Sequence, residues 1–128
     1  MNIIENLEKK FIVEKEHSAK NVGSGDLDVL STPMLVAYIE ETCKDIINMS
    51  LNNDELGSVG SKIELDHLAP SKIKNEILIK AKVKEIIKEK IIIFDIIAID
   101  NTTNKKIGIA SHTRVIINNK KFLEKLGN

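Results

Sequence analysis

Three polar side chains in apolar surroundings have residue types suited to acid–base chemistry: Thr32, Glu40 and His67. Glu40 follows Val36 by four residues and precedes Cys43 by three, so on a helix its carboxylate would lie at the border of an apolar stripe. Burial and a histidine partner would change the acidity of this carboxylate in opposite directions, and the sequence leaves that choice open. An ordinary glutamate at a helix border explains the same pattern.

His67 ends a run in which apolar and polar residues alternate, and it shares a face with Ile63 and Leu65. The alternation predicts that the imidazole points into the interior. A buried imidazole needs a hydrogen-bond partner, and a carboxylate from the neighbouring helix is the expected one. A core histidine with a satisfied ring is the alternative. Thr32, judged from the residues alone, is explained as a helix N-cap.

His112 and Arg114 fall on one face of the last extended run, where they could hold a phosphate group or pack at the surface. Gly23 and Gly25 lie in a polar stretch and are explained as a flexible turn. The sequence has no phosphate-binding glycine loop opening a helix, no pair of histidines at metal-ligand spacing and no Gly-x-Ser-x-Gly motif. We therefore expect no metal site.

A long helix over residues 31–51 is the element that must position Thr32 and Glu40. Thr32 stands where an N-cap belongs and Pro33 at the first helical position, where its missing N–H costs nothing. The helix has little polar surface and is expected to be buried on most sides. Its apolar residues are Met34, Leu35, Val36, Ala37, Tyr38, Ile39, Cys43, Ile46, Ile47 and Met49.

Extended runs that could cover this helix follow it in the sequence. Residues 76–87 alternate most clearly, and residues 91–100 are apolar on both faces, as in a central strand or one covered by a partner subunit. The remaining predictions are an edge strand over 10–16, a loop over 17–28, strands over 59–68 and 106–117, and a helical turn over 120–126. The order β-α-β4 predicts an α+β fold in which a five-stranded antiparallel sheet wraps round one long central helix.

The composition argues against several classes of function. The 128 residues are predicted to form a single domain, residues 1–128, and the 19 basic and 19 acidic residues cancel, unlike the charge of a dedicated nucleic-acid binder. Aromatic residues make up 3%, too few for base-stacking platforms. No stretch has the pattern of an export signal or a membrane span. Cys43 is the only cysteine, which favours a reducing, cytoplasmic location.

Several stretches, taken together, resemble one family over residues 22–117. They are residues 29–33 with 40–43, residues 59–61, residues 67–70, residues 107–108 and residues 111–114. Their types, order and spacing are similar to those of the hotdog-fold thioesterases, in particular the group related to fluoroacetyl-CoA thioesterase. The resemblance implies that Thr32, Glu40 and His67 form a catalytic set.

In such an enzyme, Thr32 would act as the nucleophile or orient the attacking water, Glu40 would polarise its partners, and His67 would shuttle protons. The backbone N–H of Gly60 would stabilise the oxyanion. The resemblance also implies a homodimer with acyl-CoA at the subunit interface. Since eight residues span about 12 Å of helix, Thr32 and Glu40 could converge only by long reach, a bent helix entry or contributions from two subunits.

The expected substrate is a short or medium acyl-CoA, hydrolysed to the free acid and CoA without a further cofactor. Family members specific for fluoroacetyl-CoA carry an aromatic lid before the threonine, and residues 26–30 contain no aromatic residue. The family also often has a second glycine near Ala110. A non-catalytic module that binds acyl-CoA is the alternative, and a hydratase or dehydratase on the same scaffold is a weaker one.

Overall fold

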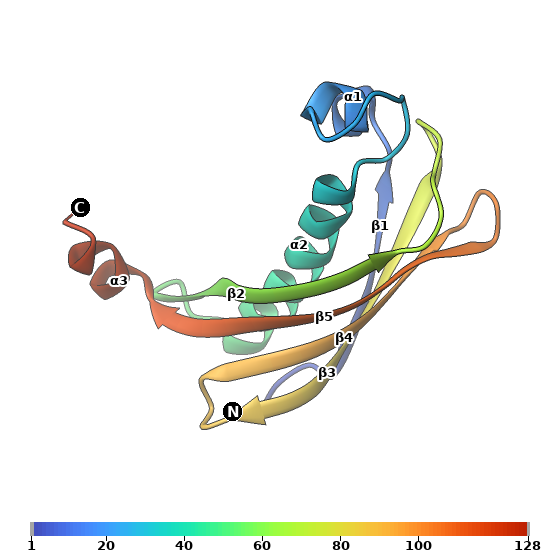
Figure 1. Cartoon of the computed structure of the whole chain (residues 1–128). Coiled ribbons are helices and arrows are strands. Elements are labelled where there is room, and N and C mark those ends of the chain that lie inside the picture. Colours follow the sequence, from blue (N-terminus) through green and yellow to red (C-terminus); the bar gives the residue numbers. More distant parts are fainter. Residues whose placement is uncertain (1, 128) are drawn as a thin grey trace.

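A helix of 20 residues, α2 (Thr32–Leu51), lies against the concave face of an antiparallel sheet (Figure 1). The computed structural model describes residues 2–127, and within them the sheet has five strands in the order β1-β3-β4-β5-β2. The strands are β1 (Asn6–Ile12), β2 (Leu56–His67), β3 (Glu76–Ile87), β4 (Ile91–Asp100) and β5 (Lys105–Asn118). The shorter helices are η1 (Lys15–His17), α1 (Ala19–Val22) and α3 (Asn119–Lys125). The predicted β-α-β4 order and α+β class are therefore confirmed.

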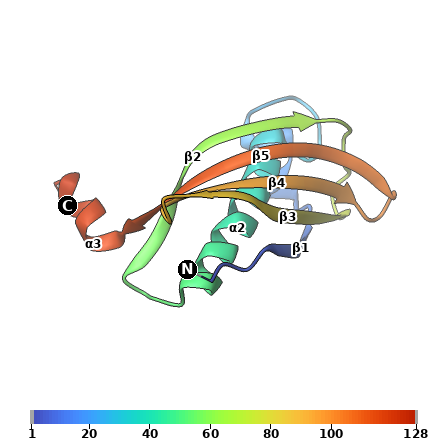
Figure 2. The same cartoon turned by 90° about the horizontal axis from the view of Figure 1, so that it is seen from below.

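One face of α2 is buried against the sheet. Its buried residues recur at intervals of three and four, as an amphipathic helix requires, and they are Leu35, Tyr38, Ile39, Thr42, Cys43, Ile46 and Ile47. The opposite face is exposed at Ala37, Glu41 and Asn48. The prediction that the helix is buried on most sides was wrong, because the arched sheet covers it from one side (Figure 2).

The start of α2 differs from the prediction by one residue. Ser31 is the N-cap, and its Oγ accepts a hydrogen bond from the backbone N–H of Met34 at 3.1 Å. Thr32 is the first helical residue and Pro33 follows it. Because Ser31 caps the helix, the hydroxyl of Thr32 is free to bind another partner.

Sequence periodicity predicted the bounds of some strands correctly and those of others incorrectly. β3 and β4 have the predicted bounds, and the edge position of the first strand is confirmed. That strand, however, begins and ends four residues earlier than predicted, because residues 15–17 form η1. α1 occupies part of the predicted loop, and Gly23 ends it with a φ of 92°.

The sheet has one long uncovered edge. β2 pairs with β5 on one side, and no other strand of residues 2–127 pairs with its second side. The core lies between α2 and the inner face of the central strands, where Ile92, Phe94 and Ile107 are fully buried. Among the described residues, no helix is long and apolar enough to cross a membrane.

Candidate active site

Thr32 and His67 meet where the N-terminus of α2 lies beside the C-terminal end of β2. Oγ1 of Thr32 is 2.8 Å from Nδ1 of His67, a hydrogen-bond distance. The pair borders an open hollow of about 340 Å³, whose lining is largely aliphatic and includes Val29, Leu30 and Leu68. The structure thus joins two of the three proposed catalytic residues at a cavity suited to a small apolar group.

His67 has the environment of a proton acceptor. Burial lowers the pKa of its imidazole below the ordinary value of 6.5, and the backbone of Ala69 partly offsets that effect. Its second nitrogen, Nε2, is buried and has no hydrogen-bond partner among residues 2–127. The prediction that a helix carboxylate would hold His67 was wrong within this chain, because the hydroxyl of Thr32 takes that place. A neutral imidazole beside a hydroxyl can act as a general base.

Glu40 lies apart from this pair and is bound to Arg114 instead. Its Oε2 is 3.5 Å from Nη1 of Arg114, in an ion pair of which the glutamate side is 43% exposed and the arginine side 8% exposed. The hydrogen bonds and ion pairs of residues 2–127 do not join Glu40 to Thr32 or His67. Within one chain the proposed catalytic set is therefore split in two.

His112 and Arg114 are buried on the inner face of β5 and do not pack at the surface. Ser58 accepts hydrogen bonds from Nε and Nη2 of Arg114, at 2.8 and 3.0 Å. His112 donates from Nδ1 to the backbone oxygen of Lys62 at 2.7 Å, and its Nε2 lies 3.2 Å from Nη1 of Arg114. Burial lowers the pKa of His112, and the charge of Arg114 acts in the same direction. The guanidinium is committed to these contacts, and this placement gives no support to the predicted role of His112 and Arg114 in holding a phosphate group, such as those of CoA.

Gly60 allows the Glu40 carboxylate to lie against the strand. A Cβ at this position would be 2.8 Å from Oε2 of Glu40 and 3.2 Å from Cε1 of His112, both closer than ordinary contact. The register of β2 shifts between Gly60 and Lys62, so the strand bulges here. The close approach explains a glycine at this position, while its role in binding an oxyanion stays a prediction.

The sequence did not predict the buried contacts around Glu40, which are its ion pair with Arg114 and the packing of Arg114 on Ser58. The alternation over 59–68 places odd-numbered residues inward, but the bulge reverses the phase, so Ser58 and Gly60 face Arg114. Cys43 lies nearby and is fully buried, and burial raises the pKa of its thiol to about 12. It is therefore not a thiolate nucleophile. No three histidines, cysteines or carboxylates of residues 2–127 are placed to hold a metal ion.

Known proteins share this fold closely. The solved structure of the fluoroacetyl-CoA thioesterase FlK matches with a TM-score of 0.86 at 20% identity, covering 98% of this chain and 95% of that chain. A thioesterase superfamily member from Thermus thermophilus matches with a TM-score of 0.85 at 21% identity, covering 98% and 90%. A hot-dog-like protein from Thermanaerovibrio acidaminovorans matches with a TM-score of 0.83 at 14% identity, covering 97% and 89%. These likenesses show the hotdog fold.

The sequence itself shows the family. No curated protein sequence matches the chain, but the family model described as fluoroacetyl-CoA-specific thioesterase, FlK, matches residues 13–120. That match includes Thr32, Glu40, Gly60 and His67, and it confirms the resemblance seen in the residues. The chain belongs to the fluoroacetyl-CoA-specific thioesterase (FlK) family of hotdog-fold thioester hydrolases.

Proposed function

We propose that the chain is a homodimeric thioesterase that hydrolyses a short or medium acyl-CoA to the free acid and CoA. The hydrogen-bonded pair of Thr32 and His67 at an apolar hollow is the observation that carries this proposal. A hollow of this size and lining suits an aliphatic acyl group whose thioester carbonyl lies at the polar end.

The proposed chemistry needs a proton acceptor beside an oxygen nucleophile. His67 takes a proton from water, or from Thr32, as the oxygen attacks the carbonyl carbon and the carbonyl oxygen becomes an oxyanion. The C–S bond then breaks, and His67 returns the proton to the CoA thiolate. If Thr32 is the nucleophile, a water molecule hydrolyses the acyl-threonine in a second step. In our proposal the N–H of Gly60 donates to the oxyanion, and no cofactor takes part.

In a dimer, residues from two subunits could together form the complete set of Thr32, Glu40 and His67. A strand edge as long as that of β2 is normally covered, and a two-fold axis at its centre would pair it antiparallel with the same strand of a second copy. The half of β2 that ends in His67 would then lie beside the half that contains Gly60 in the partner. We propose that Glu40 and Gly60 of the partner subunit complete the site of Thr32 and His67.

The substrate class rests on the lining and on the relatives. Variants of FlK have been solved with fluoroacetate and CoA and with acetyl-CoA. Apart from the imidazole of His67, the hollow in this chain is lined without aromatic side chains. We therefore propose an unspecialised acyl group rather than a fluorinated one. A cytoplasmic location is proposed with it, since CoA esters and a lone buried Cys43 both suit a reducing compartment.

The direct test is thiol release from a panel of acyl-CoAs, from acetyl and fluoroacetyl to long-chain esters. We expect turnover of the short and medium esters with little preference for fluoroacetyl-CoA. Folded Thr32→Ala and Glu40→Gln variants should lose most of it, by about 10²-fold or more. Saturable binding of CoA esters without thiol release by the parent protein would overturn the proposal and leave a binding module.

The pH dependence of hydrolysis should report the buried imidazole. His67 accepts a proton only when it is neutral, so kcat/KM should rise with pH and level off. Because burial lowers the pKa of His67, the midpoint of that rise is expected below pH 6.5. The measurement is a pH profile of kcat/KM with one ester. A midpoint above pH 7 would contradict His67 as the base in this environment.

A further inference from the structure

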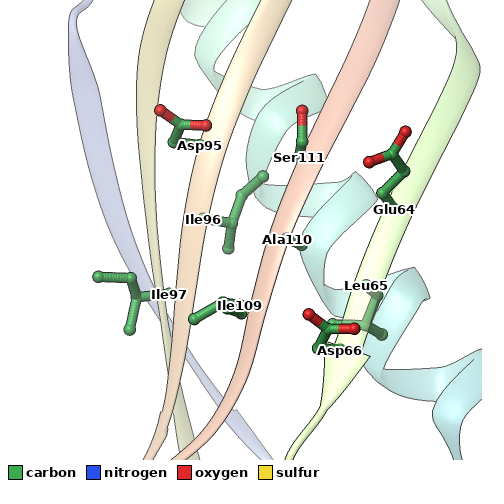
Figure 3. A pocket seen from close by; sticks show the side chains of 9 residues that line it. All are labelled: Glu64, Leu65, Asp66, Asp95, Ile96, Ile97, Ile109, Ala110 and Ser111. Carbon is green, nitrogen blue, oxygen red and sulfur yellow. The ribbon is translucent and has the colours of Figure 1, made fainter.

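The hollow beside Thr32 is lined mainly by residues outside the sheet. A second, shallow hollow of about 390 Å³ on the outer face shows the contrast, because its lining consists only of side chains from β2, β4 and β5 (Figure 3). Strand pairing fixes those side chains. At the hollow beside Thr32, residues 29–31 form one wall and residues 68–70 form another. Contacts other than strand pairing must therefore hold these walls in place.

The second wall belongs to residues 68–75, which connect β2 to β3 and form what we call the wall segment. Backbone contacts join this segment to the first wall. The N–H of Leu30 donates a hydrogen bond to the oxygen of Ser71 at 2.9 Å, and Val29 forms an isolated β-bridge with Lys72. The two walls therefore keep their spacing only while the wall segment stays in place.

The far end of the wall segment has a strained backbone conformation. Lys74 has a φ of 76°, in the left-handed region that residues with a side chain rarely occupy. Its N–H donates to the backbone oxygen of Val13 at 2.7 Å, and the N–H of Val13 donates to the oxygen of Asn75 at 3.0 Å. A strained residue persists only where the surrounding structure over-determines it, so this end of the segment depends on contacts from outside.

The carboxylate of Asp100, the last residue of β4, provides such a contact and is fully buried. Its Oδ2 accepts a hydrogen bond from Nδ2 of Asn75 at 2.8 Å, and its Oδ1 accepts from the backbone N–H groups of Thr102 and Thr103 at 2.9 and 3.2 Å. Burial acts to raise the pKa of Asp100, but the hydrogen bonds, that from Asn75 foremost, hold it below its ordinary value of 3.8. A buried charge is tolerated only when it is hydrogen-bonded, so Asp100 ties the turn after β4 to the wall segment.

We propose that Asp100 is a positioning residue for the acyl group of the substrate. Through Asn75 it holds the wall segment against residues 29–30, and it thereby fixes the aliphatic wall on which the acyl chain rests. The inference rests on the proposed thioesterase function, because it assigns the hollow beside Thr32 to the acyl group. Asp100 itself is not among the residues that line this hollow, so it acts only through the wall segment.

A loosened wall segment should impair long acyl groups more than short ones. His67 is paired with Gly108 in the sheet, so its contact with Thr32 does not depend on the far end of the segment. Each methylene that the wall buries raises kcat/KM by up to about fourfold, whereas an acetyl group has no methylene to bury. The rise per methylene is therefore the quantity to measure. A mere loss of folded protein would lower kcat/KM for every ester by the same factor and leave that rise unchanged.

Three variants test this role with acetyl-, butyryl- and hexanoyl-CoA. Asn75→Leu removes the donor to Asp100, so the rise per methylene should fall to about twofold or less, with acetyl-CoA turnover little changed. An exchange variant that carries Asn75→Asp and Asp100→Asn reverses donor and acceptor and should recover the wild-type rise. Asn101→Leu is the matched control. It makes the same substitution in the turn after β4, where Nδ2 of Asn101 donates to Glu76 at 2.9 Å, and should keep the wild-type rise.

Amide hydrogen exchange tests the position of the wall segment without any substrate. In Asn75→Leu, the N–H of Leu30 that donates to Ser71 should exchange about tenfold faster or more, the effect of losing a hydrogen bond to a charged group. The reference is the set of amides at the centre of β4, which report global unfolding. The exchange variant should restore the wild-type rate at Leu30.

The inference is overturned if Leu30 exchanges at the wild-type rate in Asn75→Leu, if the exchange variant keeps the reduced rise per methylene, or if the wild type gains nothing per methylene. Should Asn75→Leu fail to fold, Asn75→Ser, whose side chain is too short to reach Asp100, replaces it with the same expectations. Absence of thiol release from every ester would instead refute the proposed function. The exchange rate at Leu30 would still decide whether Asp100 holds the wall segment.

Discussion

Replacing His67 by asparagine is expected to lower kcat/KM for acyl-CoA hydrolysis by about 10²–10⁴-fold, the range that a general base contributes. Asparagine keeps an oxygen near the position of Nδ1 and can still bind the hydroxyl of Thr32. It lacks Nε2, the buried nitrogen that has no partner within residues 2–127. Because an amide is not basic, the substitution removes the proton acceptor, whichever ring nitrogen serves, while retaining the contact that positions Thr32.

The same exchange at His17 provides a matched control. Nδ1 of His17 accepts a hydrogen bond from the backbone N–H of Glu14 at 3.0 Å and lies 2.8 Å from the hydroxyl of Tyr38. The amide oxygen of asparagine can take the same place, outside the hollow at Thr32. His17→Asn should retain most of the activity. Both variants should unfold at nearly the wild-type temperature, and an equal loss of activity in both would assign the effect of His67→Asn to folding.

The long elements were predictable because periodicity alone determines them. Alternation over residues 76–87 and a doubly apolar run over 91–100 are properties of the strands themselves, and the structure has the same bounds. The inward position of His67 followed from the alternation of apolar and polar residues over 59–68. The meeting of Thr32 with His67 required the turn between helix and sheet, which periodicity does not describe.

Two local features of the structure could not be predicted from the sequence. The N-cap is Ser31 rather than Thr32, and both residue types cap helices well, so only the structure distinguishes them. A glycine inside a strand is compatible with a bulge but does not specify one, and the bulge after Gly60 reverses which side chains of β2 face the interior. The buried position of Arg114 and its contact with Ser58 depend on that reversal.

Glu40 has a structural role as well as a proposed catalytic one. It is the charged partner of Arg114, a buried cation that makes no other ion pair with residues 2–127. Leaving a buried charge unpaired destabilises a fold, although the exposed half of this pair is screened by water. A variant at Glu40 can therefore lose activity through either role. To separate the two roles of Glu40, an experiment must restore activity to a chain that still carries the Glu40 substitution.

Heterodimers provide that separation. We expect that a dimer of one His67→Asn chain and one Glu40→Gln chain, isolated with two different affinity tags, recovers about half of the wild-type turnover, because one of its two composite sites is intact. In that site the first chain supplies Glu40 and the second supplies Thr32 and His67. Each variant alone should be nearly inactive, and thiol release is the measurement.

The reciprocal heterodimer has the opposite expectation. It pairs a wild-type chain with a chain that carries both His67→Asn and Glu40→Gln. If the sites are composite, each of them contains one substituted residue, and the heterodimer should be nearly inactive. If each chain held a complete site, this heterodimer would keep half of the turnover and the first would have none. The stability defects at Glu40 are the same in both heterodimers, so the difference between them reports only where the catalytic groups meet.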